Sequence, residues 1–258
     1  MRRFSLNLNV FFHFIEAKAL NTVHFSHRNM KVAILYSGGK DSTFAIDMAK
    51  EKGWEIAYLL SVKPDRKDCF LFHFATVEHT KKLAEMLHLK HICVTCTVAD
   101  PIKEAQIVKE VVEKNPVDAV VLGGIGLQET QLKSIQDALR PLKIEAFAAH
   151  SGEDHAELFR KMIDKGYKIH ITQVAADGAL KWLGKTVTVD NFDNLMADAR
   201  KYGFHEGFEG GHADTLVTAG PVFGEQELEI TEANKIVDDA YCGHMVLETE
   251  IKKLVPVR

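Results

Sequence analysis

The sequence predicts an α/β protein with an open, mostly parallel sheet, helices on both faces of that sheet, and a smaller mixed α/β domain after it. Short apolar runs alternate with amphipathic segments from Met30 onward, which is typical of parallel strands joined by crossover helices. Glycine-rich turns follow two of these runs, and the alternation changes after Pro141. We therefore expect a disordered extension (residues 1–29), a first domain (30–145) and a second domain (146–258).

The first domain should alternate strands with helices. The run 117–122 is apolar throughout, as expected for a strand that is covered on both faces. Asp100 is a suitable N-cap because Pro101 follows it at the first helical position. In chain order we predict strand 31–36, helix 43–52, strand 54–62, helix 73–87, strand 91–98, helix 101–115, strand 117–122 and helix 128–139.

The second domain has a less regular pattern. The segment 191–202 carries apolar residues at i, i+3, i+4 and i+7, which indicates an amphipathic helix. The tail 222–257 alternates apolar and polar residues and suggests one or two edge strands. The expected segments are helix 153–165, strand 167–174, helix 191–202 and strand 215–217.

Composition narrows the class of protein. The chain has 258 residues, 46% of them hydrophobic, and a net charge of −4 with both signs interspersed, which argues against binding nucleic acid through bulk charge. Four cysteines at irregular spacing do not form a disulfide framework. No apolar run reaches the roughly 18 to 20 residues that a membrane helix needs. We expect a soluble, cytoplasmic protein with no membrane partner.

The extension offers a competing interpretation. Two arginines precede an apolar stretch near the start of the chain, as they do in a secretion signal. Asn7, Asn9 and His13 interrupt that stretch. We therefore favour an unstructured segment that precedes an alternative start at Met30.

Residues 37–42, with the sequence SGGKDS, lie between the first predicted strand and the first predicted helix. Gly38 and Gly39 have no Cβ atom, so their backbone N–H groups can approach an anion closely. The start of the helix adds further N–H groups and the positive end of its dipole. Ser37 and Ser42 add hydroxyl donors. The segment therefore predicts a phosphate-binding loop.

Lys40 and Asp41 extend this interpretation to catalysis. Lys40 supplies a mobile positive charge beside the expected phosphate. Asp41 would repel a phosphate unless a cation lay between them, which indicates a contact to Mg²⁺, direct or through water. We therefore take Lys40 and Asp41 as the catalytic candidates, and Asp41 as the metal ligand, of a site for a metal nucleotide.

The loop is not a Walker A motif, because Ile34 and Asp41 stand where that motif needs glycine and Ser or Thr. It resembles the pyrophosphate loop, SGGxDS, of the N-type ATP pyrophosphatases. Those enzymes cleave ATP to AMP and pyrophosphate while they adenylate a substrate. The alternative, a surface turn that happens to contain two glycines, fits poorly with a position between a strand and a helix.

A second glycine turn, at Gly123 and Gly124, follows the apolar run 117–122. Ligands of open α/β sheets bind at the carboxyl ends of strands, near the point where strand order reverses, and both glycine turns should lie on that edge. We predict that Gly123 and Gly124 let adenine or ribose approach the backbone. A tight turn without a ligand is the alternative.

The order of motifs over residues 30–257 resembles the diphthine–ammonia ligase family of N-type ATP pyrophosphatases. The resemblance implies an adenine nucleotide alpha-hydrolase-like (HUP) first domain and the use of ATP, Mg²⁺ and ammonium. It also implies that the chain amidates diphthine, a modified histidine of elongation factor 2, and that His73 contacts the nucleotide. The motifs are the loop 37–42, Phe72-His73, Gly123-Gly124, Trp182-Leu183-Gly184, Gly210-Gly211, Thr215-Leu216-Val217, Pro221 and Phe223.

Three departures from the family pattern lie in the second half, which should shape the acceptor pocket. Ala146-Phe147-Ala148 replaces a Pro-Leu-Trp after the fifth strand, Gly211-His212-Ala213 departs from a Gly-Gly-Glu-aromatic run, and Ala219 replaces an Asp. ATP use is therefore better supported than diphthine. The candidate substrate residues are Glu209, Gly210, Gly211, His212 and Thr215.

Some of these polar residues have a second interpretation. Glu209 and Asp214 either hold ammonium or a cationic substrate group, or they lie on a solvated loop. His150, His155 and His212 are acceptor-site candidates with a packing role as the alternative. The chain has no length for a glutaminase domain, so we expect free ammonium as the nitrogen source.

Two other functions fit the same loop. One is the modification of tRNA or a small molecule by the same adenylation chemistry, and the other is a non-catalytic adenine-nucleotide sensor. A thiolation form of the first would use Cys93 and Cys96, but residues three apart on a strand point to opposite faces. We therefore expect the two sulfur atoms to diverge.

Overall fold

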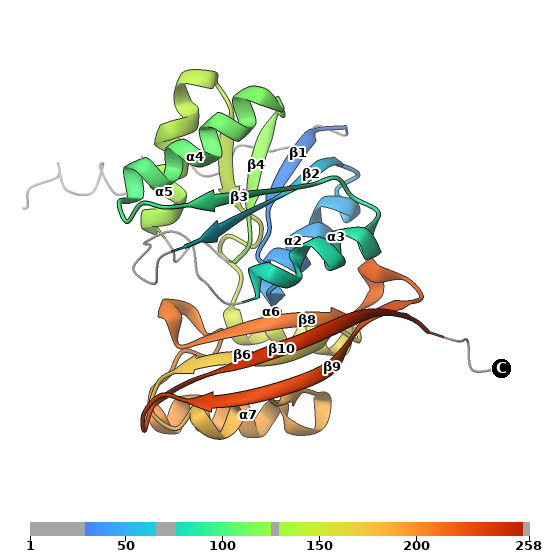
Figure 1. Ribbon diagram of the computed structural model, residues 1–258, viewed down its shortest axis with the longest axis vertical. Helices are drawn as coiled ribbons and strands as arrows, with labels where there is room; N and C mark the ends of the chain where they lie inside the picture. The colour runs from blue at the N-terminus through green and yellow to red at the C-terminus, as the bar shows by residue number, and fades with distance from the viewer. Residues whose placement is uncertain (1–28, 66–75, 125–128, 255–258) are drawn as a thin grey trace, which may run out of the picture.

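The computed structural model describes residues 29–65, 76–124 and 129–254, and these residues form two sheets with helices between them (Figure 1). The expected extension, apart from its last residue, lies outside the described residues, as does His73. Within the described ranges, none of the helices combines the length and the apolar character that crossing a bilayer requires.

The first sheet is parallel and has the order β3-β2-β1-β4-β5. This confirms the predicted open parallel sheet. The strand order reverses between β1 and β4, so the two glycine turns that follow these strands lie at one switch point. The strands are β1 (Lys31–Leu35), β2 (Glu55–Pro64), β3 (His91–Cys96), β4 (Ala119–Leu122) and β5 (Glu145–Ala148).

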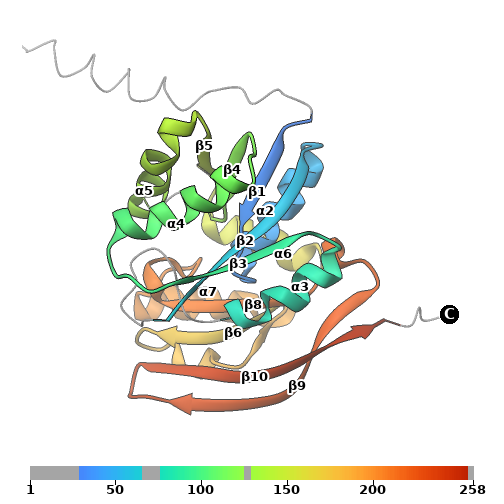
Figure 2. The same ribbon diagram turned by 45° about the horizontal axis from the view of Figure 1, so that its top comes forward.

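Helices cover both faces of this sheet, as predicted (Figure 2). One face packs Ile34 and Val121 against α2 and α3, and the other packs Ala33 and Val120 against α4 and α5. Neighbouring residues of one strand thus enter opposite cores, because side chains alternate along a strand. The helices are α2 (Lys40–Glu51), α3 (Thr80–Leu87), α4 (Pro101–Lys114) and α5 (Glu129–Leu139); η1 (Val77–His79) precedes α3, and η2 (Arg140–Leu142) follows α5.

Two element boundaries differ from the sequence expectation in ways that matter for the site. Helix α2 begins at Lys40, three residues before the expected start, so half of the glycine loop is already the first helical turn. Strand β5 includes Ala146, Phe147 and Ala148, which we expected after a strand. Strand β5 has only four residues, which is too short for its hydrophobic pattern to indicate a strand in the sequence.

The second sheet is antiparallel and centres on β6 (Lys168–Ala175), which pairs with β7, β8 and β10. The tail forms two long strands, and β10 lies between β6 and β9, so only β9 is an edge strand of the pair. The other strands are β7 (Thr186–Val187), β8 (Ala213–Ala219), β9 (Gln226–Val237) and β10 (Cys242–Lys253). The helical segments are α6 (His155–Asp164), α7 (Val189–Tyr202), η3 (Leu180–Trp182), η4 (Glu209–Gly211) and η5 (Pro221–Phe223).

The two sheets share one apolar core. It runs from Ile34 of β1 through Phe44 of α2 to Ile171 of β6 and Leu216 of β8, all of them buried. The backbone N–H of Val217 also donates to the carbonyl oxygen of Gly38 at 3.0 Å. Strand β8 therefore packs directly against the glycine loop.

Candidate active site

The glycine loop connects β1 to α2 and has the conformation that its glycines predict. Gly38 has φ +82°, a left-handed conformation that disfavours other residues. A Cβ on Gly39, the N-cap of α2, would lie 3.1 Å from the carbonyl oxygen of Thr215. Glycine is therefore needed at Gly38 for the turn and at Gly39 for the close approach of β8.

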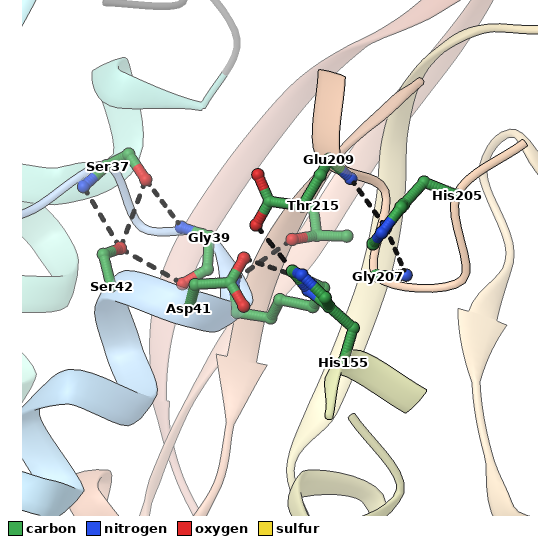
Figure 3. Close-up of polar contacts among 10 residues, drawn as sticks. Ser37, Gly39, Asp41, Ser42, His155, His205, Gly207, Glu209 and Thr215 are labelled. Atoms are coloured by element: carbon green, nitrogen blue, oxygen red, sulfur yellow. Dashed lines mark hydrogen bonds and ion pairs between the residues drawn. The ribbon is translucent and has the colours of Figure 1, made fainter. Parts of the chain in front are cut away.

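Hydroxyl oxygens accept hydrogen bonds from three backbone N–H groups of this loop (Figure 3). The N–H of Ser37 donates to Oγ of Ser42 at 3.3 Å, and that of Gly39 donates to Oγ of Ser37 at 3.4 Å. The N–H of Lys40 donates to Oγ1 of Thr215 at 3.1 Å. No side chain from within α2 caps its N-terminus. Each of the three donors thus has its own hydroxyl acceptor, and a phosphate bound at the loop would have to take the place of these oxygens.

Lys40 is more constrained than a mobile surface lysine. Its side chain is 4% exposed, and its Nζ lies 2.6 Å from Oδ2 of Asp41 and 5.5 Å from the ring centroid of Phe159 on α6. The pairing offsets the cost of burying the ammonium group. In this state Lys40 bonds to Asp41, and it must turn to reach a phosphate.

Asp41 carries the one carboxylate of the loop 37–42, so it is the residue of the loop that could bind a metal ion. Its side chain is 30% exposed and lines the same pocket as Ser37, Gly39 and Ser42. Within the described ranges, no group of three or more His, Cys, Asp or Glu side chains is arranged to hold a metal ion. This donor set fits Mg²⁺ bound mainly through nucleotide phosphates and one carboxylate, rather than through a protein cage.

The second glycine turn contacts the first. A Cβ on Gly123 would lie 2.5 Å from the backbone nitrogen of Ser42, so the close packing of α2 accounts for this glycine. Gly124 has φ +81°, and a Cβ there would lie 3.4 Å from Oε1 of Glu209. Both glycines line the pocket beside the loop 37–42.

The second domain forms the opposite wall of this pocket. Glu209, Gly211 and Thr215 line it, while Gly210 and His212 do not. His212 instead turns toward its own loop, where Nδ1 accepts a hydrogen bond from the backbone N–H of His205 at 2.8 Å. The wall consists of Gly207, Phe208, Glu209, Gly211, Ala213, Asp214 and Thr215.

Two histidines lie near this wall. His155 begins α6, and its ring contacts that of His205 edge to face, with 4.4 Å between centroids. Burial lowers the pKa of His155 to about 4, and the neighbouring His205 and Lys40, which disfavour a second positive charge, add to the effect. Burial also lowers the pKa of His205, with His212 and Lys40 adding to the effect. Both imidazoles are therefore neutral at pH 7.

Sequence reasoning missed three residues of the site. Thr76 donates from Oγ1 to the carbonyl oxygen of Ser37 at 2.9 Å, and Gln131 lines the pocket. The third, His205, lies near the pocket wall, where its ring contacts that of His155. None of the three stands in a motif, and each reaches the site through tertiary packing, so no local signal pointed to them.

The other candidates are placed as follows. Cys93 is exposed and Cys96 is buried on the same strand, so the predicted divergence of the two side chains is confirmed. His150 is buried and stacks on Phe44, with 5.1 Å between ring centroids. Burial lowers its pKa.

Comparison with known proteins identifies the family. The model of the diphthamide synthase N-terminal domain matches residues 30–145, and that of the C-terminal domain matches residues 154–253. The diphthine–ammonia ligase of Mus musculus is 28% identical over 75% of this chain and 80% of its own length. The diphthine–ammonia ligase of Homo sapiens is 26% identical over 86% of this chain and 94% of its own.

Among solved structures, the U34-tRNA thiolase NcsA of Methanococcus maripaludis, with its 4Fe-4S cluster, overlaps with part of the chain. The thiolase is 16% identical to this chain. The match covers 59% of this chain and 65% of the thiolase chain, with a TM-score of 0.35. The two domain matches together span both sheets and the pocket between them. The chain belongs to the diphthamide synthase family.

Proposed function

We propose that the chain is an ATP-dependent amide ligase that converts diphthine to diphthamide on elongation factor 2. It adenylates the carboxylate, releases pyrophosphate, and transfers ammonia to the acyl-adenylate. One observation carries this proposal: the loop 37–42 and the wall 207–215 of the second domain line the same pocket. A nucleotide held by the loop and an acceptor held by the wall would meet there.

The first step forms the acyl-adenylate. A carboxylate oxygen of the acceptor attacks the α-phosphorus of ATP, the bond from that phosphorus to the bridging oxygen breaks, and pyrophosphate leaves. The N–H groups of Gly39 and Lys40 would donate to phosphate oxygens in place of the hydroxyls they now contact. The hydroxyls of Ser37 and Ser42 would then act as donors, and Lys40 would exchange Asp41 for the leaving pyrophosphate. Mg²⁺, held by Asp41 and the phosphates, would offset the growing negative charge.

The second step forms the amide. Ammonium loses a proton to water, and the resulting ammonia attacks the carbonyl carbon of the mixed anhydride. AMP leaves with the oxygen that joined it to the acyl group, and the nitrogen releases one more proton to water to give the amide. Because the carboxylate is adenylated first, the group that leaves is AMP and not oxide, which is a poor leaving group. Glu209, 10% exposed at the pocket wall, would hold ammonium before the attack.

The test is a reconstituted reaction with ATP, Mg²⁺, ammonium and elongation factor 2 that carries diphthine. We expect AMP and pyrophosphate in amounts equal to the amide, and neither product without the acceptor. Ser42→Ala should lower the rate about 100-fold, since it removes a donor to the transition state. Thr231→Ala, on the exposed strand β9, is the matched control. ADP and phosphate as products would contradict the proposal.

A second candidate is amidation of another carboxylate, on tRNA or a small molecule. The observation that favours it is the position of His212, which bonds to its own loop instead of facing the pocket. Amide formation on such an acceptor, with none on diphthine, would establish this alternative. AMP formation with neither acceptor present, or no AMP under any condition, would favour a nucleotide-binding protein of another kind.

A further inference from the structure

Thr76 has a backbone conformation that is unfavourable for its side chain. It precedes η1 with φ +69° and ψ −15°, in the left-handed region, where a β-branched residue is rare and strained. Strained residues of this kind persist only where the surrounding structure imposes the conformation, and they gather at functional sites. Thr76 is buried and lines the pocket beside the glycine loop, but the chemistry proposed so far gives it no role.

The turn that carries Thr76 is held from the second domain. The carbonyl oxygen of Thr76 accepts a hydrogen bond from the backbone N–H of His79 at 2.9 Å, which closes the turn of η1. Nδ1 of His79 lies 3.2 Å from Oγ1 of Thr249 on β10, and both side chains are buried. Lys82 of α3 donates from Nζ to the carbonyl oxygen of Thr249. These contacts fix Thr76 in its strained conformation.

The hydroxyl of Thr76 acts on the glycine loop. Its Oγ1 donates to the carbonyl oxygen of Ser37 at 2.9 Å, across 39 residues of chain. A threonine hydroxyl has one hydrogen, so this contact leaves only lone pairs on the Thr76 oxygen. Lone pairs repel the oxygens of a phosphate. In this state Thr76 is therefore suited to holding the loop and not to binding the phosphate itself.

Three successive carbonyl oxygens of the loop each accept a hydrogen bond. A trans peptide is planar, so its N–H group points away from its carbonyl oxygen. The three contacts therefore also fix the directions of the N–H groups of residues 38, 39 and 40, which are donors expected to bind phosphate. The contacts are Oγ1 of Thr76 to Ser37 at 2.9 Å, the N–H of Val217 to Gly38 at 3.0 Å, and the N–H of Thr43 to Gly39 at 3.0 Å.

The peptide between Ser37 and Gly38 is the one of these three that depends on a side chain. Backbone donors of β8 and α2 hold the other two carbonyl oxygens, whereas a hydroxyl, that of Thr76, holds the oxygen of Ser37. Gly38 has no Cβ and adopts positive and negative φ about equally well, so it offers little resistance to rotation of this peptide. A peptide that turned over would present its carbonyl oxygen in place of its N–H and would repel a phosphate.

We propose that Thr76 is a positioning residue of the nucleotide site. Its hydroxyl holds the peptide between Ser37 and Gly38 in the orientation that leaves an N–H group, and not a carbonyl oxygen, to the phosphates. The left-handed turn brings this hydroxyl to the loop, which accounts for the strain at Thr76. The inference rests on the nucleotide-binding part of the proposed function and does not depend on the identity of the acceptor.

The test measures the binding of inorganic pyrophosphate with Mg²⁺, by titration calorimetry, in Thr76→Val and Thr76→Ser. Valine keeps the branched shape of the side chain and removes the hydroxyl. We expect its dissociation constant to rise about 10- to 100-fold, which is equivalent to the loss of one hydrogen bond to a charged group. Serine keeps the hydroxyl and should bind pyrophosphate as the wild type does. Equal weakening in both variants, or wild-type affinity in Thr76→Val, would overturn the inference.

Thr80→Val is the matched control. Thr80 is also buried, and its hydroxyl donates to the carbonyl oxygen of Val77 at 2.6 Å, in the same turn but not in the glycine loop. Urea denaturation should show a loss of stability in both valine variants, while only Thr76→Val loses affinity for pyrophosphate. If Thr80→Val loses as much affinity, the turn as a whole orders the loop and the Thr76 hydroxyl has no special role.

The wild-type protein separates this inference from the proposed function. Binding of pyrophosphate and ATP without formation of AMP, in the presence of ammonium and elongation factor 2 that carries diphthine, would contradict the amide-ligase function alone. The variants would then still decide the role of Thr76. A wild-type protein that binds neither pyrophosphate nor ATP in the presence of Mg²⁺ would overturn both.

Discussion

The hydroxyl of Thr215 accepts a hydrogen bond from the backbone N–H of Lys40 across 175 residues of chain, at 3.1 Å, and both residues are buried. This contact caps α2 from the other domain. It also places Thr215, a residue of the pocket wall, on the first turn of α2. Binding of a phosphate at the loop would therefore compete with, or rearrange, a contact to the second domain.

Replacing this hydroxyl should weaken both stability and adenylation. Thr215→Val keeps the shape of the side chain but leaves the Lys40 N–H without its acceptor. We expect the free energy of unfolding to fall by about 1–3 kcal/mol, the cost of a buried donor left without a partner. Urea denaturation measures this loss, and exchange between ATP and pyrophosphate measures adenylation. Thr215→Ser, which keeps an oxygen, should stay close to wild type; equal loss in both variants would contradict the capping role.

Gly123 should tolerate no side chain, for a reason unrelated to ligand binding. A Cβ there would lie 2.5 Å from the backbone nitrogen of Ser42 and 2.7 Å from the carbonyl carbon of Asp41. Gly123→Ala must shift the start of α2, so we expect a loss of about 1–3 kcal/mol or more and slow adenylation.

Gly53→Ala is the control for this substitution. Gly53 has φ +70°, and no atom lies within 4 Å of the position that a Cβ would take, so alanine meets only the backbone cost of about 1 kcal/mol. Thermal unfolding of both variants compares the two costs. A Gly123→Ala protein as stable as Gly53→Ala would show that the contact with α2 relaxes freely.

The part of the site that follows local rules was predictable. The turn at residues 37–42 was predictable from six consecutive residues, because adjacent glycines between a strand and a helix favour such a turn. The helices of the first domain were likewise predictable from their periodicity. The start of α2 at Lys40 was not predictable, because the oxygen that caps this helix belongs to Thr215, which is distant in the sequence.

The rest of the site depends on contacts between distant segments. His155 and His205 are 50 residues apart, and nothing near either of them in the sequence indicates that their rings meet. The inward turn of His212 depends in the same way on the backbone of His205. Strands β5 and β7 are four and two residues long, too short for a period to be detected.

Acid should destabilise the fold through its buried histidines. Burial lowers the folded-state pKa of His170 to about 4, below the unfolded value near 6.5. Between these values the unfolded chain binds more protons, so stability is full above about pH 6.5 and falls as pH decreases toward 4. His170 alone should cost about 2 kcal/mol between pH 7 and pH 5.

Urea denaturation at the two pH values, in wild type and His170→Gln, isolates this contribution. Glutamine does not titrate, so the variant should lose less stability on acidification than the wild type. An identical pH dependence in the two proteins would show that His170 is protonated in the folded state or that the fold opens around it.

Asp41 has two roles that a single variant can separate. Asp41→Asn removes the carboxylate that we assign to Mg²⁺ and also leaves the Lys40 ammonium, 4% exposed, without its partner. We expect the Mg²⁺ concentration for half-maximal exchange between ATP and pyrophosphate to rise about tenfold or more, because asparagine is a weaker metal ligand. Glu51→Gln, which removes an ion-paired carboxylate at the far end of α2, is the control and should leave this concentration unchanged. If Asp41→Asn slows exchange equally at every Mg²⁺ concentration, Asp41 acts by holding Lys40 and not by holding the metal.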